Sequence, residues 1–180
     1  MLKEEFQEKV VPKLKDKIGK GNPYGVPRVT KIIVNMGVGA SRENKGDLEK
    51  AREELARILG QTPAFRPARR AVASFGIRSG DIVGISATLR SRKMWDFLEK
   101  LIKIVLPRTR DFKGISRRSF DGSGNLTIGI KEHTAFPEID PHKVEKIRGL
   151  EVTIVTNAGD DEKAYQVLKE LGVPFKEEHA

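Results

Sequence analysis

Apolar residues at helical spacing mark several segments of the chain as helices. At the N-terminus, Leu2, Phe6, Val10 and Leu14 recur every four residues, and Pro12 is expected to kink or break this helix. Further helices are predicted over residues 48–59, ended by Gly60, over 91–105, capped by Ser91 and ended by Pro107, over a short stretch from Asp140 and Pro141, and over 160–171, ended by Gly172. The longer ones carry one apolar face, so each is expected to pack on a sheet or on another helix.

Runs rich in β-branched residues predict strands over residues 29–36, 82–90, 126–131 and 151–156. Because side chains alternate along a strand, Ile85 and Leu89 lie on one face, and Thr88 and Arg90 lie on the other, as Asn35 does on the first strand. The predicted fold class is α+β: one domain over residues 1–180, with a mixed, largely antiparallel sheet of about four to five strands, helices on one face and a split βαβ arrangement. The other face is expected to be open, small and polar, with an ordinary solvated face as the alternative.

The net charge is +9, and it is unevenly distributed. Residues 66–118 contain 14 Lys and Arg against 4 Asp and Glu, whereas the remaining 127 residues contain 20 against 21. Ten of the 14 are arginines, whose planar guanidinium group suits bidentate contact with phosphate. This concentration favours a nucleic-acid partner over a surface kept basic for solubility. The sequence has no recognition-helix motif, so RNA is favoured and no DNA partner is expected.

Other motifs resemble functional sites, but each lacks a required residue. Gly37 and Gly39 follow the first strand as in a dinucleotide-binding loop, yet Arg42 stands where the third glycine belongs. Asp121 begins an EF-hand-like spacing in which Leu126 replaces the glycine, so a turn is predicted instead. The three histidines lack metal-ligand spacing and the chain has no cysteine. We therefore expect no enzyme, no metal and no cofactor, and a reducing, cytoplasmic location.

Residues 66–80 are the most distinctive segment of the sequence. They include four arginines, Pro67 and two glycines, with no acidic residue and no sustained period. A long loop in a compact domain usually has a function, and these arginines could reach RNA phosphates. Phe75 could stack on an exposed base, but anchoring of the loop to the core is favoured. A second basic cluster follows the helix over 91–105: Arg108, Arg110, Lys113, Arg117 and Arg118. No stretch approaches the about 18 to 20 apolar residues of a membrane span, so no membrane partner is expected.

Several short blocks of sequence occur in the order typical of one protein family. They are VPRV at 26–29, NMGVG at 35–39, GQTP at 60–63, ATLR at 87–90, LPRTRDFKG at 106–114, SFDGSGN at 119–125 and FPEI at 136–139. Through these blocks the chain from about Val26 to Phe175 resembles the bacterial large-subunit ribosomal protein five family. The resemblance implies an α+β protein of the cytoplasmic ribosome that binds large-subunit ribosomal RNA and 5S ribosomal RNA, and helps attach the 5S RNA in the central protuberance. It also implies contacts with the peptidyl-site tRNA and, in an intersubunit bridge, with small-subunit protein thirteen.

The resemblance also implies roles for individual residues. The 5S contact falls on Asn35, Gln61, Thr88 and Arg90, of which the strand alternation places all but Gln61 on the open face. The tRNA-binding loop corresponds to Arg69, Arg70, Phe75 and Arg78, where Ala71 and Gly76 replace a serine and a lysine of the family. Further contacts with ribosomal RNA phosphates are expected from Arg66, Arg92, Arg108, Arg110 and Lys113, and the bridge is expected around residues 136–142. Two alternatives remain: a general chaperone of structured RNA, and a nucleotide-dependent enzyme that uses the glycines at 37 and 39.

Overall fold

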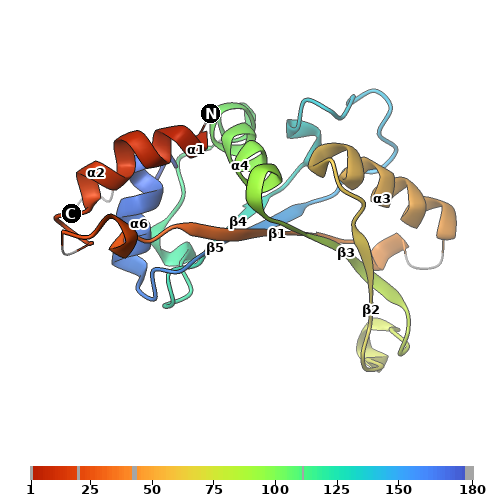
Figure 1. Cartoon of the computed structure of the whole chain (residues 1–180). Coiled ribbons are helices and arrows are strands. Elements are labelled where there is room, and N and C mark those ends of the chain that lie inside the picture. The colour runs from red at the N-terminus through yellow and green to blue at the C-terminus, as the bar shows by residue number, and fades with distance from the viewer. Residues whose placement is uncertain (1, 20, 42–43, 111, 177–180) are drawn as a thin grey trace. The chain divides into compact units, whose positions relative to one another are not determined.

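A computed structural model of the chain describes residues 2–19, 21–41, 44–110 and 112–176. One sheet has the strand order β2-β3-β1-β5-β4 and contains β1 (Val29–Gly37), β2 (Ala64–Pro67), β3 (Ile82–Leu89), β4 (Leu126–Ile130) and β5 (Leu150–Thr156) (Figure 1). The start of β1 lies beside the end of β5, because the Asn157 backbone N–H donates to the Arg28 carbonyl oxygen over 3.2 Å. Helices cover one face of the sheet, so the predicted α+β class is confirmed, and β2 adds a fifth strand to the four indicated by the sequence.

Six α-helices occur in the described part of the chain: α1 (Leu2–Glu5), α2 (Val11–Leu14), α3 (Lys45–Leu59), α4 (Ser91–Lys100), α5 (Leu106–Arg108) and α6 (Asp161–Glu170). Two π-helical segments, Phe6–Val10 and Leu101–Val105, join α1 to α2 and α4 to α5. Short 3₁₀ turns lie at Pro23–Gly25, Gly39–Ser41, Ala73–Phe75, Arg117–Ser119 and His133–Ala135. Within the described ranges, no helix has the length and apolar character needed to cross a membrane.

Each π-helical segment ends two residues before a proline. Pro12 and Pro107 lack an N–H, and in an α-helix their rings would crowd the carbonyl group four residues earlier. The residues before them, Val11 and Leu106, instead donate their N–H groups to carbonyl oxygens five residues back. The N-terminal helix is therefore continuous through Pro12. The prediction that Pro107 ends its helix was wrong, because that helix continues to Arg108.

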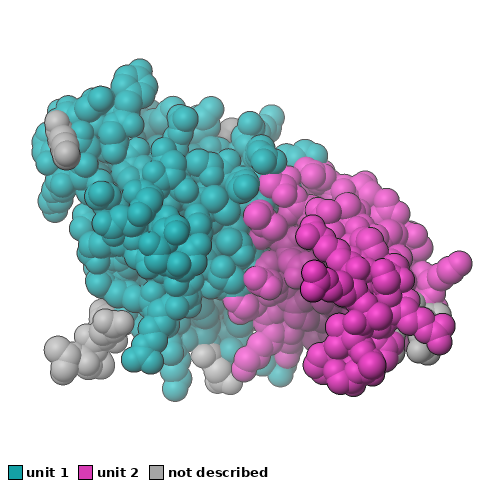
Figure 2. Space-filling view, turned by 90° about the horizontal axis from the view of Figure 1, so that it is seen from below, with its two compact units in different colours: residues 1–32, 89–128, 152–180 teal, residues 33–88, 129–151 magenta. Residues whose placement is uncertain are grey.

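The chain divides into two compact units, which Figure 2 colours separately. Unit 1 comprises residues 1–32, 89–128 and 152–180, and unit 2 comprises residues 33–88 and 129–151. The core of unit 1 includes the apolar faces of its helices: Leu2, Phe6, Val10, Leu14, Met94, Phe97, Leu98, Leu101, Val105, Ala164, Val167 and Leu168. The core of unit 2 includes Val34, Met36, Leu48, Ala51, Leu55, Ile58, Ile85 and Phe136. The helical spacings read from the sequence thus identify buried faces in both units.

Three local predictions were wrong. Ser91 does not cap α4, since it has a left-handed φ of 52° and Arg90, which precedes the helix, makes no capping hydrogen bond. The helix expected from Asp140 is a turn, in which the Asp140 carboxylate accepts the His142 backbone N–H over 3.0 Å. Residues 64–67, which were included in part in the irregular loop, form edge strand β2. Pro67 lies at an irregularity in its pairing with β3, a position where proline is tolerated.

Candidate nucleic-acid interface

The outward face of β3 in unit 2 is built from small and polar side chains. Ile85 points inward and is buried, whereas Ser86 and Thr88 are half-buried on the opposite face. Gly84 continues this outward row, and its lack of a side chain leaves room for the amide of Asn35. A Cβ atom at Gly84 would lie 3.5 Å from Asn35 Oδ1. Two strands therefore place an amide and hydroxyl groups on one surface, which we call the polar face: Asn35, Gly84, Ser86 and Thr88.

Arg66 joins the polar face from the neighbouring strand. In the antiparallel pairing of β2 with β3, Arg66 lies opposite Gly84 and Ala64 lies opposite Ser86. Arg66 Nε donates to Ser86 Oγ over 2.6 Å, while the arginine side chain remains exposed. This hydrogen bond orients a guanidinium group across the polar face, where it is accessible to an anion. Arg66 is thus part of the sheet rather than of a loop.

Gln61 reaches the same strand from the end of α3. Gly60 ends this helix in the left-handed conformation, with a φ of 61°, as its position in the sequence predicted. The chain turns there, and Gln61 Nε2 donates to the Thr88 carbonyl oxygen over 3.4 Å. Periodicity could not have indicated this placement, because a loop residue has no strand register. Gln61 therefore lies beside Thr88 at the end of β3.

Two groups of the polar face have no internal partner. Within the described ranges, neither the Asn35 amide nor the Thr88 hydroxyl makes a hydrogen bond, and both side chains are half-buried. Such groups can bond a ligand without first breaking a bond inside the protein. Arg90 follows Thr88 by two residues along the chain, is exposed, and immediately precedes α4 in unit 1. Asn35, Gln61 and Thr88 therefore line one surface of unit 2, whereas Arg90 belongs to the other unit.

Residues 68–81 continue the β2–β3 pair as an ordered hairpin, which we call the arm. At its base the Ala68 N–H donates to the Asp81 carbonyl oxygen over 2.8 Å. Near its tip, Val72 and Ile77 donate their N–H groups to each other's carbonyl oxygens over 2.8 and 3.1 Å. Gly76, with a φ of 60°, ends the 3₁₀ turn and closes the tip. The irregular loop expected from the sequence is therefore a hairpin with its own hydrogen bonds.

The arm exposes cations and one aromatic ring. Arg69, Arg70 and Arg78 are all exposed. Phe75 at the tip is 72% exposed, so the prediction that it anchors this segment to the core was wrong. The acidic residue at the base, Asp81, accepts the Arg78 backbone N–H over 2.8 Å. The arm is therefore a cationic projection with a ring free for stacking.

Four further predicted phosphate contacts lie in unit 1: Arg92, Arg108, Arg110 and Lys113, all exposed. Their neighbour Arg117 is used in packing, with its guanidinium carbon 3.8 Å from the centre of the Tyr165 ring and Nη1 3.5 Å from Glu162. Asp111, the acid of this cluster, lies outside the described residues. The remaining exposed cations extend the positive surface of unit 1 beyond the arm-bearing unit.

The motifs set aside in the sequence have structural roles. Asp121 accepts the backbone N–H groups of Ser123 and Asn125 over 2.9 and 3.1 Å, so the predicted turn is confirmed. A hydrogen bond from the Asn125 side chain is the main cause that holds the pKa of Asp121 below its ordinary value. After Gly39, the N-terminus of α3 is capped by the Asn44 side chain, while Arg42 lies outside the described residues. No group of three His, Asp or Glu side chains able to hold a metal occurs where the structure is described.

A buried polar cluster in unit 2 was missed by sequence reasoning. His133 is fully buried, and its Nδ1 accepts the Arg148 backbone N–H over 3.1 Å. Its Nε2 lies 3.3 Å from Glu54 Oε2, and Arg148 Nη1 donates to the same oxygen over 2.9 Å. Burial lowers the pKa of His133 below its ordinary value and outweighs the opposing effect of the Glu54 carboxylate. This cluster closes the base of the segment that contains the expected bridge residues 136–142.

A polar sheet face combined with an arginine-bearing arm is typical of a protein that binds RNA. Residues 22–78 match the family described as Ribosomal protein L5, and residues 82–175 match the ribosomal L5 family C-terminus. The protein called large ribosomal subunit protein uL5 from Roseiflexus sp. is 49% identical over 176 residues, which cover 98% of each chain. Proteins of the same name from Rubrobacter xylanophilus and Halothermothrix orenii are both 48% identical, over 97% of each chain for the first and over 98% of this chain and 99% of the relative for the second.

This chain therefore belongs to the ribosomal protein L5 family, as the resemblance of its sequence blocks indicated. Members of this family are ribosomal proteins and not enzymes, which confirms the prediction that the chain is not an enzyme. The alternative of a nucleotide-dependent enzyme is set aside on the same ground.

Proposed function

We propose that this chain is a component of the large ribosomal subunit that binds 5S ribosomal RNA and helps attach it in the central protuberance. The observation that carries the proposal is the pair of unpartnered groups on the polar face, the Asn35 amide and the Thr88 hydroxyl. Folded RNA offers 2′-hydroxyl groups, base edges and phosphates that can bond both. Family membership supports the assignment, and places the chain on the ribosome of the bacterial cytoplasm.

The residues of the polar face would divide the work between recognition and charge. Asn35 and Thr88 make hydrogen bonds to the RNA, and Gln61 adds an amide beside Thr88. Arg66 supplies a charge to phosphate from within the face, and Arg90 supplies another from the residue after β3. The face has no aromatic pair, so recognition depends on hydrogen bonds and shape rather than on base stacking. Further contacts with ribosomal RNA phosphates come from unit 1: Arg92, Arg108, Arg110 and Lys113.

The arm and the segment over residues 136–142 serve other partners in this proposal. The arm contacts the peptidyl-site tRNA through three exposed arginines and Phe75: Arg69, Arg70 and Arg78. Gly76 stands where the family has a lysine, so the arm brings one cation fewer to this contact. The segment over residues 136–142 meets small-subunit protein thirteen in the intersubunit bridge. Its base is held by the cluster of Glu54, His133 and Arg148, which supports a fixed surface.

A competition gel shift with labelled 5S ribosomal RNA tests the proposal. Asn35→Ala and Thr88→Val should each cost about 1 to 3 kcal/mol of binding, or about 5- to 150-fold in affinity, because each leaves an RNA group without its partner. Thr134→Val, a threonine of unit 2 outside the polar face, is the matched control and should bind normally. Unchanged affinity in both test variants would move the interface elsewhere. Equal competition by an unrelated structured RNA would instead identify a general RNA chaperone.

A further inference from the structure

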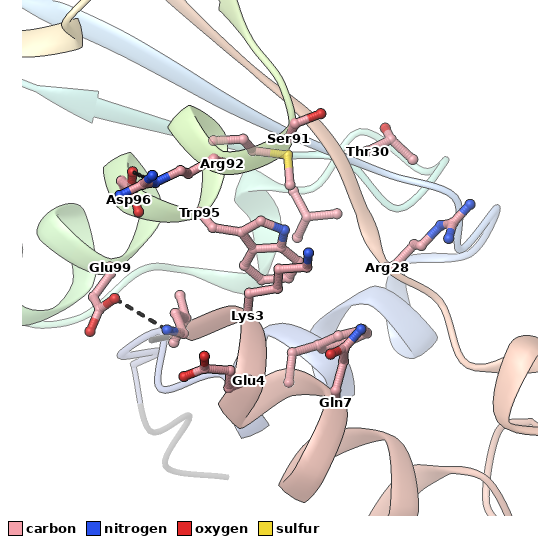
Figure 3. Close-up of a pocket in the computed structure, with 14 residues that line it drawn as sticks. Lys3, Glu4, Gln7, Arg28, Thr30, Ser91, Arg92, Trp95, Asp96 and Glu99 are labelled. Atoms are coloured by element: carbon pink, nitrogen blue, oxygen red, sulfur yellow. Dashed lines mark hydrogen bonds and ion pairs between the residues drawn. The ribbon is translucent and has the colours of Figure 1, made fainter.

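A groove of about 810 Å³ lies in unit 1 between the N-terminal helix, the start of β1 and the start of α4 (Figure 3). Its floor is apolar and includes the buried side chains of Leu2, Val29 and Met94. Trp95, the single tryptophan of the chain, is half-buried in the wall, with its ring centre 5.5 Å from that of Phe6. The polar face of unit 2 shares no residue with this groove, so the groove is a separate candidate site.

Three cations stand at the rim of the groove: Lys3, Arg28 and Arg92. In the part of the chain that the structure describes, the side chains of Lys3 and Arg28 make no ion pair or hydrogen bond, and both are exposed. Arg92 lies 3.6 Å from Asp96, but both side chains are more than half exposed, so water weakens this pair. These three charges are therefore accessible to an anion in the groove.

The rim carboxylates do not cancel this positive charge. Glu99 accepts the Leu2 backbone N–H over 3.2 Å and a hydrogen bond from Lys103 Nζ over 2.7 Å. The bond from Lys103 is the main cause that holds the pKa of Glu99 below its ordinary value, so Glu99 stays ionised within its own pair. Glu4 also has an interaction partner inside the chain. Asp96 is shared with Arg92, which leaves Lys3 and Arg28 as unbalanced cations.

Backbone strain occurs at the same rim. Ser91 has a φ of 52°, and it is the one non-glycine residue with a positive φ among those described. A non-glycine residue in this conformation costs about 1 to 3 kcal/mol, and such residues cluster at ligand sites. The strain places Ser91 and Arg92 side by side at the mouth of the groove, next to Trp95.

We infer that this groove binds an unpaired nucleotide of RNA, with the base against Trp95 and the phosphate between Arg28 and Arg92. A groove of this volume suits a small ligand, and an aromatic wall beside arginines is the combination that holds unstacked bases. A peptide would find no backbone partner here. β1 lies between β3 and β5, so it has no free edge, and the other walls are helices with internally bonded backbones. The inference rests on the proposed RNA-binding function but uses different residues.

Fluorescence of Trp95 tests the inference directly, since it is the only indole signal of the chain. The full chain is titrated with a single-stranded hexanucleotide of mixed sequence, with an RNA duplex of the same length and with inorganic phosphate. We expect the single strand to quench Trp95 at concentrations at least tenfold below the duplex, because paired bases cannot enter the groove, and phosphate to leave the signal unchanged. Equal quenching by the duplex, or none by the single strand, would overturn the inference.

Charge variants show whether the rim holds the phosphate. Arg28→Ala and Arg92→Ala should each weaken binding of the hexanucleotide about five- to tenfold, because each removes a charged donor. Lys9→Ala removes an exposed cation of the same helix outside the groove and should change binding less than twofold. Equal loss in all three variants would show attraction to the surface in general and would remove the site. Stronger quenching by an acidic peptide containing one phenylalanine would assign the groove to a protein partner instead.

The outcome is separable from that of the proposed function. If 5S binding fails, quenching of Trp95 by the hexanucleotide still supports the groove as a nucleotide site. If the groove fails, the effect of Asn35→Ala on 5S binding is unaffected. Among positive outcomes, Arg28→Ala weakens 5S binding when the nucleotide belongs to 5S RNA, and leaves it unchanged when the nucleotide belongs to another RNA.

Discussion

The ion pair between Arg148 and Glu54 should stabilise unit 2 far more than the exposed pairs do. Its side chains are only 9% and 17% exposed, and Nη1 lies 2.9 Å from Oε2. The pair between Lys50 and Glu145 has a similar distance, 2.6 Å, but its side chains are 57% and 64% exposed. Both pairs link α3 to the segment over residues 131–149. They therefore form a matched comparison in which burial is the main difference.

The cost of breaking each pair follows from that difference. Arg148→Met keeps most of the apolar stem but leaves the Glu54 carboxylate beside buried His133 without a compensating charge. Breaking a fully buried pair costs about 3 to 5 kcal/mol, and the partial exposure of Glu54 reduces our expectation to about 2 to 3 kcal/mol. Lys50→Met should cost less than about 0.5 kcal/mol, because water already screens that pair.

Urea unfolding followed by far-UV circular dichroism measures both costs. Equal slopes of the unfolding free energy against urea would show that the variants expose the same surface on unfolding. The double variant Glu54→Gln with Arg148→Met should recover most of the loss, because no charge then remains unpaired. If Arg148→Met costs no more than Lys50→Met, burial does not set the strength of these pairs and the reasoning is refuted.

Four further predictions concern other parts of the molecule. Because burial lowers the pKa of His133, the free energy of unfolding should fall as the pH drops below the ordinary imidazole pKa of 6.5, and urea midpoints from about pH 8 to about pH 5 should show less of this fall in His133→Gln. Gly114→Ala should lower Tm by several degrees in a thermal melt, since φ is +91° and the new Cβ would lie 2.7 Å from the Lys176 nitrogen. Alanine at Arg69, Arg70 and Arg78 should leave 5S binding within twofold but weaken tRNA crosslinking in assembled ribosomes, and equal loss of both would merge the two sites. The logarithm of 5S affinity should fall against the logarithm of salt with a slope of roughly −4 to −5 for about six phosphates, and a flat line would contradict the electrostatic contribution.

The sequence predicts best where one regular backbone relates neighbouring side chains. Along β3 the period of two separates buried Ile85 from accessible Thr88, and this needs no knowledge of the partner strands. Gly60 ends α3 as predicted, because few residues other than glycine adopt the left-handed conformation that terminates a helix. Asn35 could be placed on the polar face for the same reason as Thr88.

The sequence predicts poorly where contacts join distant residues. Gln61 reaches the Thr88 carbonyl across 27 positions, and Arg148 meets Glu54 across 94, so neither contact follows from local pattern. Strand β2 is four residues long and includes a proline, which made it read as a loop until its pairing with β3 was known. Phe75 was expected to be buried because it is apolar, but the arm that carries it has no core of its own.

The two π-helical segments also determine which residues can align along a helix. Apolar residues at every fourth position drift by about 40° per step around an α-helix, since four residues turn more than a full circle. The wider turn at Phe6–Val10 takes up this drift, and the whole N-terminal row is buried: Leu2, Phe6, Val10 and Leu14. Deleting one residue from that turn would rotate every later side chain away from its neighbours and press the ring of Pro12 against the preceding carbonyl group. The number of residues in this turn is therefore more tightly constrained than their chemical identity.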